Sequence, residues 1–220
     1  MSEYRLVNPI ISEVKTLVEE ERFREALACV EKELNAEISK HSKFELLSLR
    51  CFLFRHAGAE QKALADADEC IKLSPEEAKG YVLKAEVLNS LKQFADAINV
   101  VKLGLARCSE GSELEKLKRL VEGRIELKKA KESLGKGDSR KSIHLFTNLL
   151  RQPTAAVADA DLFKVRLHRS RAFVSERKWQ EALEDARECV RMSPKDARAW
   201  TALSTAYDGM GRIQEARAAY

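Results

Sequence analysis

Long apolar runs are missing from this sequence, and residues that break helices are scarce. No stretch approaches the roughly 18 consecutive apolar residues of a membrane-spanning helix, so we predict no membrane segment. Only 9 of the 220 residues are Gly and 4 are Pro, whereas 34% are charged and 45% are hydrophobic. This composition is unlike that of a β-sandwich and favours a helix-rich protein, long enough to bury a sizeable core.

Signals for export, disulfides and metal binding are missing too. The N-terminal residues show neither a basic start followed by an apolar stretch nor an Arg- and Ser-rich, acid-poor composition. The cysteines are odd in number, widely spaced and without a C-x-x-C pair: Cys29, Cys51, Cys70, Cys108 and Cys189. We therefore predict reduced thiols, no metal site and a cytoplasmic location.

Catalytic motifs are equally absent. The four histidines form no metal-ligand spacing, and no nucleophile elbow, Walker loop or dinucleotide fingerprint occurs. The segment Gly135–Ser139 has two glycines but is better explained as a tight turn than as a phosphate loop. Two carboxylate groups, one around Asp66 and one around Asp185, are expected on a solvated outer face. We predict that the chain is not an enzyme and binds no cofactor.

An internal repeat is the strongest signal in the sequence. Residues 44–78 align without a gap to residues 163–197, which lie 119 residues later. The identical positions include Phe44/Phe163, Arg50/Arg169, Phe54/Phe173, Ala63/Ala182, Asp66/Asp185, Ala67/Ala186, Cys70/Cys189 and Pro75/Pro194. Apolar residues recur at spacings of three and four, which predicts two helices in each unit.

The ends of these helices are also marked. Gly58 interrupts the first apolar run, and Arg177–Lys178 stands at the equivalent turn of the later unit. Ser74–Pro75 and Ser193–Pro194 end the second helix, because proline lacks an amide hydrogen and disfavours helical geometry in the residue before it. Such a pair of helices cannot cover its own apolar face, so the units must stack.

These units, of about 34 residues each, resemble the tetratricopeptide repeat. The resemblance implies an all-α fold, a right-handed superhelix of about five to six helix–turn–helix repeats. We predict a first block over residues 1–122, with repeats at 7–40, 44–77 and 78–111, and a second block over 123–220, with repeats at 123–156, 163–196 and 197–220. Residues 112–134 are predicted to form one long amphipathic helix between the blocks, and the alternative is a single uninterrupted superhelix.

The last predicted repeat stops at Tyr220, part-way through its second helix. Repeat arrays generally need a polar capping helix. We therefore expect a fragment of a longer protein, or an end that a partner protects.

In the family that this sequence resembles, the first helices of successive repeats line a concave groove that binds peptides. A known use is a clamp of Lys, Asn and Arg side chains that grips the C-terminal carboxylate of heat-shock chaperones. Here the five clamp positions fall on Ile11, Lys15, Leu49, Lys79 and Leu83 in the first half, and on Leu127, Lys131, His168, Arg198 and Ala202 in the second half. The anchoring Asn residues are missing from both halves, so the clamp mostly fails.

Two different grooves remain as candidate peptide sites. The first is the more apolar, with Leu49, Phe52, Val82 and Leu83, although these residues could equally be buried between helices, and Lys79 is a further candidate there. The second is basic, with Lys128, Lys131, Lys164, His168, Arg171 and Arg198, although these could be ordinary solvated side chains. Residues 1–111 hold 16 basic and 19 acidic side chains, and residues 112–220 hold 23 and 16. This asymmetry favours an acidic partner for the second half.

The leading functional prediction is a protein–protein interaction scaffold or adaptor, and its more specific form is a protein similar to a co-chaperone. The alternative is the targeting module of a longer enzyme or of a J-domain protein, whose other domain would lie beyond residue 220. Nucleic-acid binding is not expected, because the basic residues are interleaved with acidic ones rather than massed.

Overall fold

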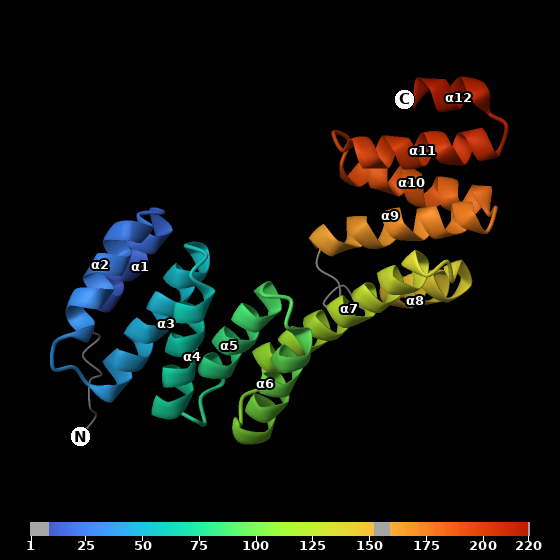
Figure 1. Ribbon diagram of the computed structural model, residues 1–220. Helices are drawn as coiled ribbons and strands as arrows, with labels where there is room; N and C mark the ends of the chain where they lie inside the picture. Colours follow the sequence, from blue (N-terminus) through green and yellow to red (C-terminus); the bar gives the residue numbers. More distant parts are fainter. Residues whose placement is uncertain (1–8, 152–158, 220) are drawn as a thin grey trace. The chain divides into compact units, whose positions relative to one another are not determined.

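A computed structural model of the protein describes residues 9–151 and 159–219. Every regular element in this part of the chain is an α-helix, so the all-α prediction is confirmed (Figure 1). The helices are α1 (Pro9–Glu19), α2 (Phe23–Leu34), α3 (Lys40–His56), α4 (Glu60–Leu73), α5 (Ala78–Ser90), α6 (Phe94–Arg107), α7 (Ser112–Gly135), α8 (Ser139–Arg151), α9 (Asp159–Ser175), α10 (Trp179–Met192), α11 (Ala197–Gly209) and α12 (Ile213–Ala218).

The chain divides into two compact units, residues 1–118 and residues 119–220. Helix α7 runs across this division, and it is the single long helix expected for residues 112–134. The predicted block boundary after residue 122 lies within the same helix and stays a prediction. The predicted repeat limits at residues 7, 156 and 220 lie outside the described residues.

Each pair of helices is joined by the same tight turn. One residue in each turn has a positive φ angle: Glu21, Gly58, Lys92, Gly137, Arg177 and Gly211. At Lys92 the backbone N–H donates to the Asn89 carbonyl at 3.1 Å, and the next N–H, of Gln93, donates to the Leu88 carbonyl at 2.9 Å. This Schellman pairing satisfies helix-end carbonyls and reverses the chain. The turns predicted at Gly58 and at Arg177 are therefore confirmed, and the second of them forms without glycine.

The predicted Ser–Pro stops are also confirmed. Helix α4 ends at Leu73 and α10 ends at Met192, each directly before the Ser–Pro pair. The Ser74 N–H still donates to the Cys70 carbonyl at 2.9 Å, and the proline that follows prevents a further turn. Helices α4 and α10 both have 14 residues as a result.

In the first unit the helices form two layers. Helix α3 packs against α4 of its own repeat and also against α1 and α5, the first helices of the neighbouring repeats. Among the described residues, the second helices α2, α4 and α6 show no comparable packing on one another. The first helices therefore make one continuous layer (Figure 1). The core between the two layers is formed by clusters that include Val14, Val30, Leu46, Cys51 and Ala67.

The second unit is built in the same way. Helix α9 packs against α8, α10 and α11, so α9 and α11 are again adjacent first helices. One cluster joins α9, α10 and α11 through Phe163, Leu183 and Leu203. Another joins the end of α7 to α8 and α9 through Leu127 and Phe146.

The two matching repeats share a buried ion pair. Asp66 on α4 accepts two hydrogen bonds from the Arg50 guanidinium on α3, at 2.8 and 2.6 Å. Asp185 on α10 accepts two from Arg169 on α9, at 2.6 and 2.8 Å. The aspartate side chains are only 6% and 2% exposed. Our prediction that they lie on a solvated outer face was wrong, since a carboxylate so deeply buried requires the arginine opposite it.

Other contacts recur at the same interval of 119 residues. The Tyr81 hydroxyl donates to the Pro75 carbonyl at 2.9 Å, and the Trp200 indole donates to the Pro194 carbonyl at 2.7 Å. In each case an aromatic side chain from the following repeat fastens the Ser–Pro turn of the preceding one. The sequence repeat is therefore a repeat of individual interactions as well as of helices.

We expect Asp185→Asn to lower the free energy of unfolding by about 3 kcal/mol, because it leaves the Arg169 guanidinium buried without its counter-charge. The double change Arg169→Met with Asp185→Leu should recover much of this loss, because both charges are then removed together. Chemical denaturation measures both effects. The neighbouring exposed carboxylate provides the control, and Glu184→Gln should change stability by less than about 0.5 kcal/mol. A loss for Asp185→Asn as small as that of the control would contradict the role of the pair.

Candidate functional site

One side of α9 is left uncovered by its neighbours and is basic. Lys164, His168 and Arg171 lie at spacings of four and three residues and therefore share one helix face. Lys164 and Arg171 are exposed, and His168 is half-buried. The flanking first helices contribute Lys131 from α7 and Arg198 from α11. We refer to these five residues, all in the second unit, as the basic face.

His168 is at the centre of the basic face. Its ring lies nearly parallel to that of Phe146 on α8, with the ring centroids 6.1 Å apart. Burial lowers the pKa of His168 to about 4, and the positive charges of Lys131, Arg171 and Arg198 contribute to this shift. The imidazole is therefore neutral at pH 7 and can donate one hydrogen bond. Lys131, Arg171 and Arg198 belong to α7, α9 and α11, so cations from three helices contribute to this shift.

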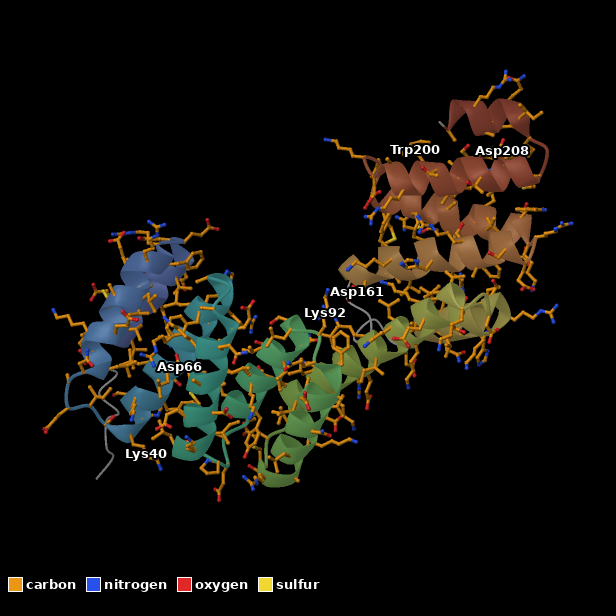
Figure 2. All side chains as sticks on the ribbon, viewed as in Figure 1. Lys40, Asp66, Lys92, Asp161, Trp200 and Asp208 are labelled. Carbon is orange, nitrogen blue, oxygen red and sulfur yellow. The ribbon has the colours of Figure 1, made fainter. Side chains whose placement is uncertain are left out.

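Acidic neighbours offset part of this charge. Asp161, labelled in Figure 2, accepts a hydrogen bond from Lys164 at 2.8 Å and one from Arg124 at 3.2 Å. Asp196 pairs with Arg198 at 2.7 Å in an exposed position, where an ion pair contributes little. Arg171 forms no ion pair within the described part of the chain. The basic face therefore keeps a net positive charge.

The first unit presents different chemistry at the same positions. Counting back 119 residues from Lys164, His168, Arg171 and Arg198 leads to Glu45, Leu49, Phe52 and Lys79. Glu45 accepts a hydrogen bond from Lys79 at 2.8 Å, which ties α3 to α5. A second ion pair, between Arg55 and Glu86, joins the same two helices further along. We refer to Glu45, Leu49, Phe52, Lys79 and Leu83 as the neutral face.

The apolar members of the neutral face are partly buried. Leu49 packs against the cluster of α1, α2 and α3, and Leu83 packs against the cores on either side of α5. Phe52 lies beside His56, with ring centroids 4.4 Å apart, and His56 stacks on Phe23. Leu49 and Leu83 therefore contribute to the core, whereas Phe52 belongs to an aromatic group at the end of α3.

The structure explains why the carboxylate clamp fails in both halves. Ile11 and Leu127, at the first clamp position of each half, are buried in their cores. Ala202, at the last position of the second half, is buried as well. These side chains cannot reach a ligand, and none of them is a charged hydrogen-bond donor. A clamp of the standard kind therefore has no anchor at these positions.

Two features of the basic face were missed from the sequence. The first is Asp161, whose spacing of three residues from Lys164 is a recognisable helix ion pair. The second is the aromatic support from Phe146, which depends on how α8 packs against α9. The predicted binding roles of Lys131, Lys164, His168, Arg171 and Arg198, and those of Leu49, Phe52, Lys79 and Leu83, stay predictions.

Within the described residues, no group of three or more His, Cys, Asp or Glu side chains is placed to hold a metal ion. The same part of the chain contains no helix long and apolar enough to cross a membrane. All five cysteines are free thiols, and Cys51, Cys70 and Cys189 are buried. Burial raises the pKa of the Cys51 and Cys189 thiols to about 12, so neither is a nucleophile at neutral pH.

Comparison with known proteins agrees with this repeat architecture. The sequence pattern of the tetratricopeptide repeat family matches residues 167–220, which hold most of α9 and all of α10 and α11. The matched residues have the sequence pattern of a tetratricopeptide repeat, and the described helices have the fold of stacked repeats of this kind. The chain is also similar to heat shock protein STI1 of Saccharomyces cerevisiae, with 31% identity over 83 residues, which are 38% of this chain and 13% of that protein.

Solved structures share the fold. The tetratricopeptide repeat domain of P58(IPK) is similar over 96% of this chain and 58% of that domain, with 17% identity and a TM-score of 0.55. A tetratricopeptide repeat protein from Parabacteroides merdae is similar over 96% of this chain and 76% of its own, with 14% identity and a TM-score of 0.52. The pilus biogenesis factor PilW is similar over 98% and 90%, with 13% identity and a TM-score of 0.58. At such identities the likeness concerns the fold alone.

The setting of His168 generates a prediction about pH. Its pKa is lower in the folded protein than the ordinary value near 6.5, so the unfolded chain binds a proton first as the pH falls. We expect the contribution of neutral His168 to stability to be complete above pH 6.5 and to be lost progressively as the pH falls towards 4. Chemical denaturation at several pH values measures this effect. Between pH 6.5 and 4, the free energy of unfolding should fall less steeply in His168→Gln than in the unchanged protein.

The cause of the shift can be tested separately. We expect Arg171→Gln to raise the pKa of His168, because one of the nearby positive charges is removed. NMR of the imidazole proton as a function of pH measures this pKa. Arg191→Gln on α10 is the control, since Arg191 is not among the charges that act on His168. An unchanged pKa in Arg171→Gln would show that Arg171 does not face the imidazole.

Proposed function

We propose that this protein is an interaction scaffold whose second unit binds an acidic segment of a partner protein on the basic face. The fold supports the general part of this proposal, because stacked tetratricopeptide repeats present first-helix surfaces to other proteins. The specific part is supported by one observation. Lys164, His168 and Arg171 share one side of α9, Arg198 of α11 lies over Phe163 of the same helix, and Arg171 has no carboxylate partner among the described residues.

The neutral face of the first unit provides the contrast within the same chain. Its charged side chains already pair with each other, Lys79 with Glu45 and Arg55 with Glu86. Each of these cations has its own carboxylate, so the net attraction for an acidic ligand is small there, whereas Arg171 on the basic face has no carboxylate partner among the described residues. Electrostatic complementarity therefore favours the second unit as the site for an acidic segment.

A co-chaperone role is the most specific form of this proposal. It is supported by the similarity to heat shock protein STI1, which covers 38% of this chain. The absence of the clamp side chains means that a chaperone tail would have to be held by Lys131, His168, Arg171 and Arg198 instead. A cytoplasmic location is part of the proposal and is supported by the five free thiols.

Calorimetry with an Asp- and Glu-rich synthetic peptide tests this function. We expect the peptide to bind the intact chain, and Arg171→Glu with Arg198→Glu to weaken binding by about tenfold or more, because two attractive contacts become repulsive. Binding should also weaken as salt is added, since exposed charges are screened. An amidated twin of the peptide shows whether the terminal carboxylate takes part.

The matched control is Lys79→Glu in the first unit, which reverses a charge at the position equivalent to Arg198. We expect it to leave the affinity of the acidic peptide unchanged. Equal losses in the two units, or no loss in either, would contradict the assignment to the basic face. Circular dichroism of each variant establishes that the helices remain folded.

A further inference from the structure

The cations of the basic face are gathered at one place rather than spread along the helices. Arg198 lies with its guanidinium carbon 5.5 Å from the centre of the Phe163 ring, which brings α11's cation to the start of α9. His168, fixed by its stacking on Phe146, lies five residues after Phe163 and one turn after Lys164, and Arg171 follows on the next turn. Burial lowers the pKa of His168, and the positive charges of Lys131, Arg171 and Arg198 add to this shift, which agrees with their placement around it.

The acidic side chains in this region have limited capacity to neutralise these cations. Asp161 is shared between Lys164 and Arg124, at 2.8 and 3.2 Å, so one carboxylate serves two cations. Asp196 reaches only Arg198, in an exposed pair. No carboxylate of the described residues pairs with Arg171. A ligand that carries more than one negative charge in a small volume would neutralise the remaining positive charge of the basic face.

The types of donor favour one ligand chemistry. Arginine offers a planar fork of N–H groups that matches two oxygens of a phosphate, and His168 adds a single N–H. A phosphorylated side chain carries a charge of roughly −1.5 to −2 and three acceptor oxygens, whereas Asp or Glu carries one charge and two oxygens. Several converging donors thus fit a phosphate better than one carboxylate.

We propose that the basic face binds a phosphorylated side chain of a partner protein, with Arg171 as the forked donor, His168 as the N–H donor three residues before it, and Arg198, which already donates from two nitrogens to Asp196, as a nearby positive charge. This inference rests on the proposed function, because it names the acidic group that the second unit prefers. Lys131 adds charge from α7. The neutral face of the first unit lacks such a site, since Leu49 and Phe52 replace His168 and Arg171.

Three peptides of one sequence test the proposal, with Ser, Glu or phosphoserine at a single position. We expect fluorescence anisotropy to show phosphoserine binding about tenfold more tightly than Glu, and Arg171→Gln to remove most of this gain. Lys178→Gln, an exposed lysine at the turn before α10, is the control and should keep the gain. A second readout is the His168 imidazole, whose pKa should rise when the phosphopeptide binds, because a nearby negative charge favours the imidazolium.

The outcomes separate the two proposals. If the Glu peptide binds through the basic face and phosphoserine adds nothing, the phosphate inference is wrong and the proposed function stands. If neither peptide binds, both are wrong. If inorganic phosphate or vesicles of anionic lipid bind as tightly as the phosphopeptide, with the same sensitivity to Arg171→Gln, the inference of a phosphorylated protein partner is overturned.

Discussion

Each helix pair in this protein has apolar side chains on more than one side, and it can bury them only by stacking against the next pair. This constraint determines which residues can change. Arg50 with Asp66 and Tyr81 with Pro75 hold a repeat together or fasten it to its neighbour, and their counterparts 119 residues later make the same contacts. The side chains on the uncovered side of the first helices do not make these contacts between helices and repeats. On that side, Lys164, His168 and Arg171 of the later repeat replace Glu45, Leu49 and Phe52.

The difference between the two faces is one of charge pairing. On the neutral face, Lys79 faces Glu45, so neither side chain is available without breaking a pair. On the basic face the counterpart of Glu45 is Lys164, and an acid is replaced by a base. The counterpart of Lys79 is Arg198, whose partner Asp196 comes from the preceding turn rather than from α9. One scaffold can therefore offer two ligand surfaces with the backbone nearly unchanged.

Much of the fold could be predicted from the sequence, because the signals are local. Proline stops a helix wherever it occurs, and the spacing of apolar residues identifies the buried side. The turn at Arg177 was predicted from its alignment with Gly58, although a positive φ angle is uncommon for arginine. The burial of Asp66 and Asp185 was not predicted, because it depends on which residue lies opposite on the other helix. The only trace of this pairing in the sequence is that Arg50 and Arg169 are 119 residues apart, the same interval that separates Asp66 from Asp185.

The candidate site was only partly accessible to the same reasoning. The spacing of Lys164, His168 and Arg171 places them on one side of a helix without any structure. The low pKa of His168 depends on burial and on cations from two other helices, which no local pattern shows. Leu83 was a candidate for ligand binding but packs against the cores around α5, because an apolar side chain on a first helix can turn inward.

We propose that a few positions on the first helices decide which unit binds an acidic ligand. The most direct test gives the first unit the chemistry of the second through Glu45→Lys, Leu49→His and Phe52→Arg, since Lys79 is already present and Lys15 is exposed on α1. Calorimetry should then show two acidic peptides bound per chain instead of one. A variant that remains helical by circular dichroism and still binds a single peptide would contradict the claim.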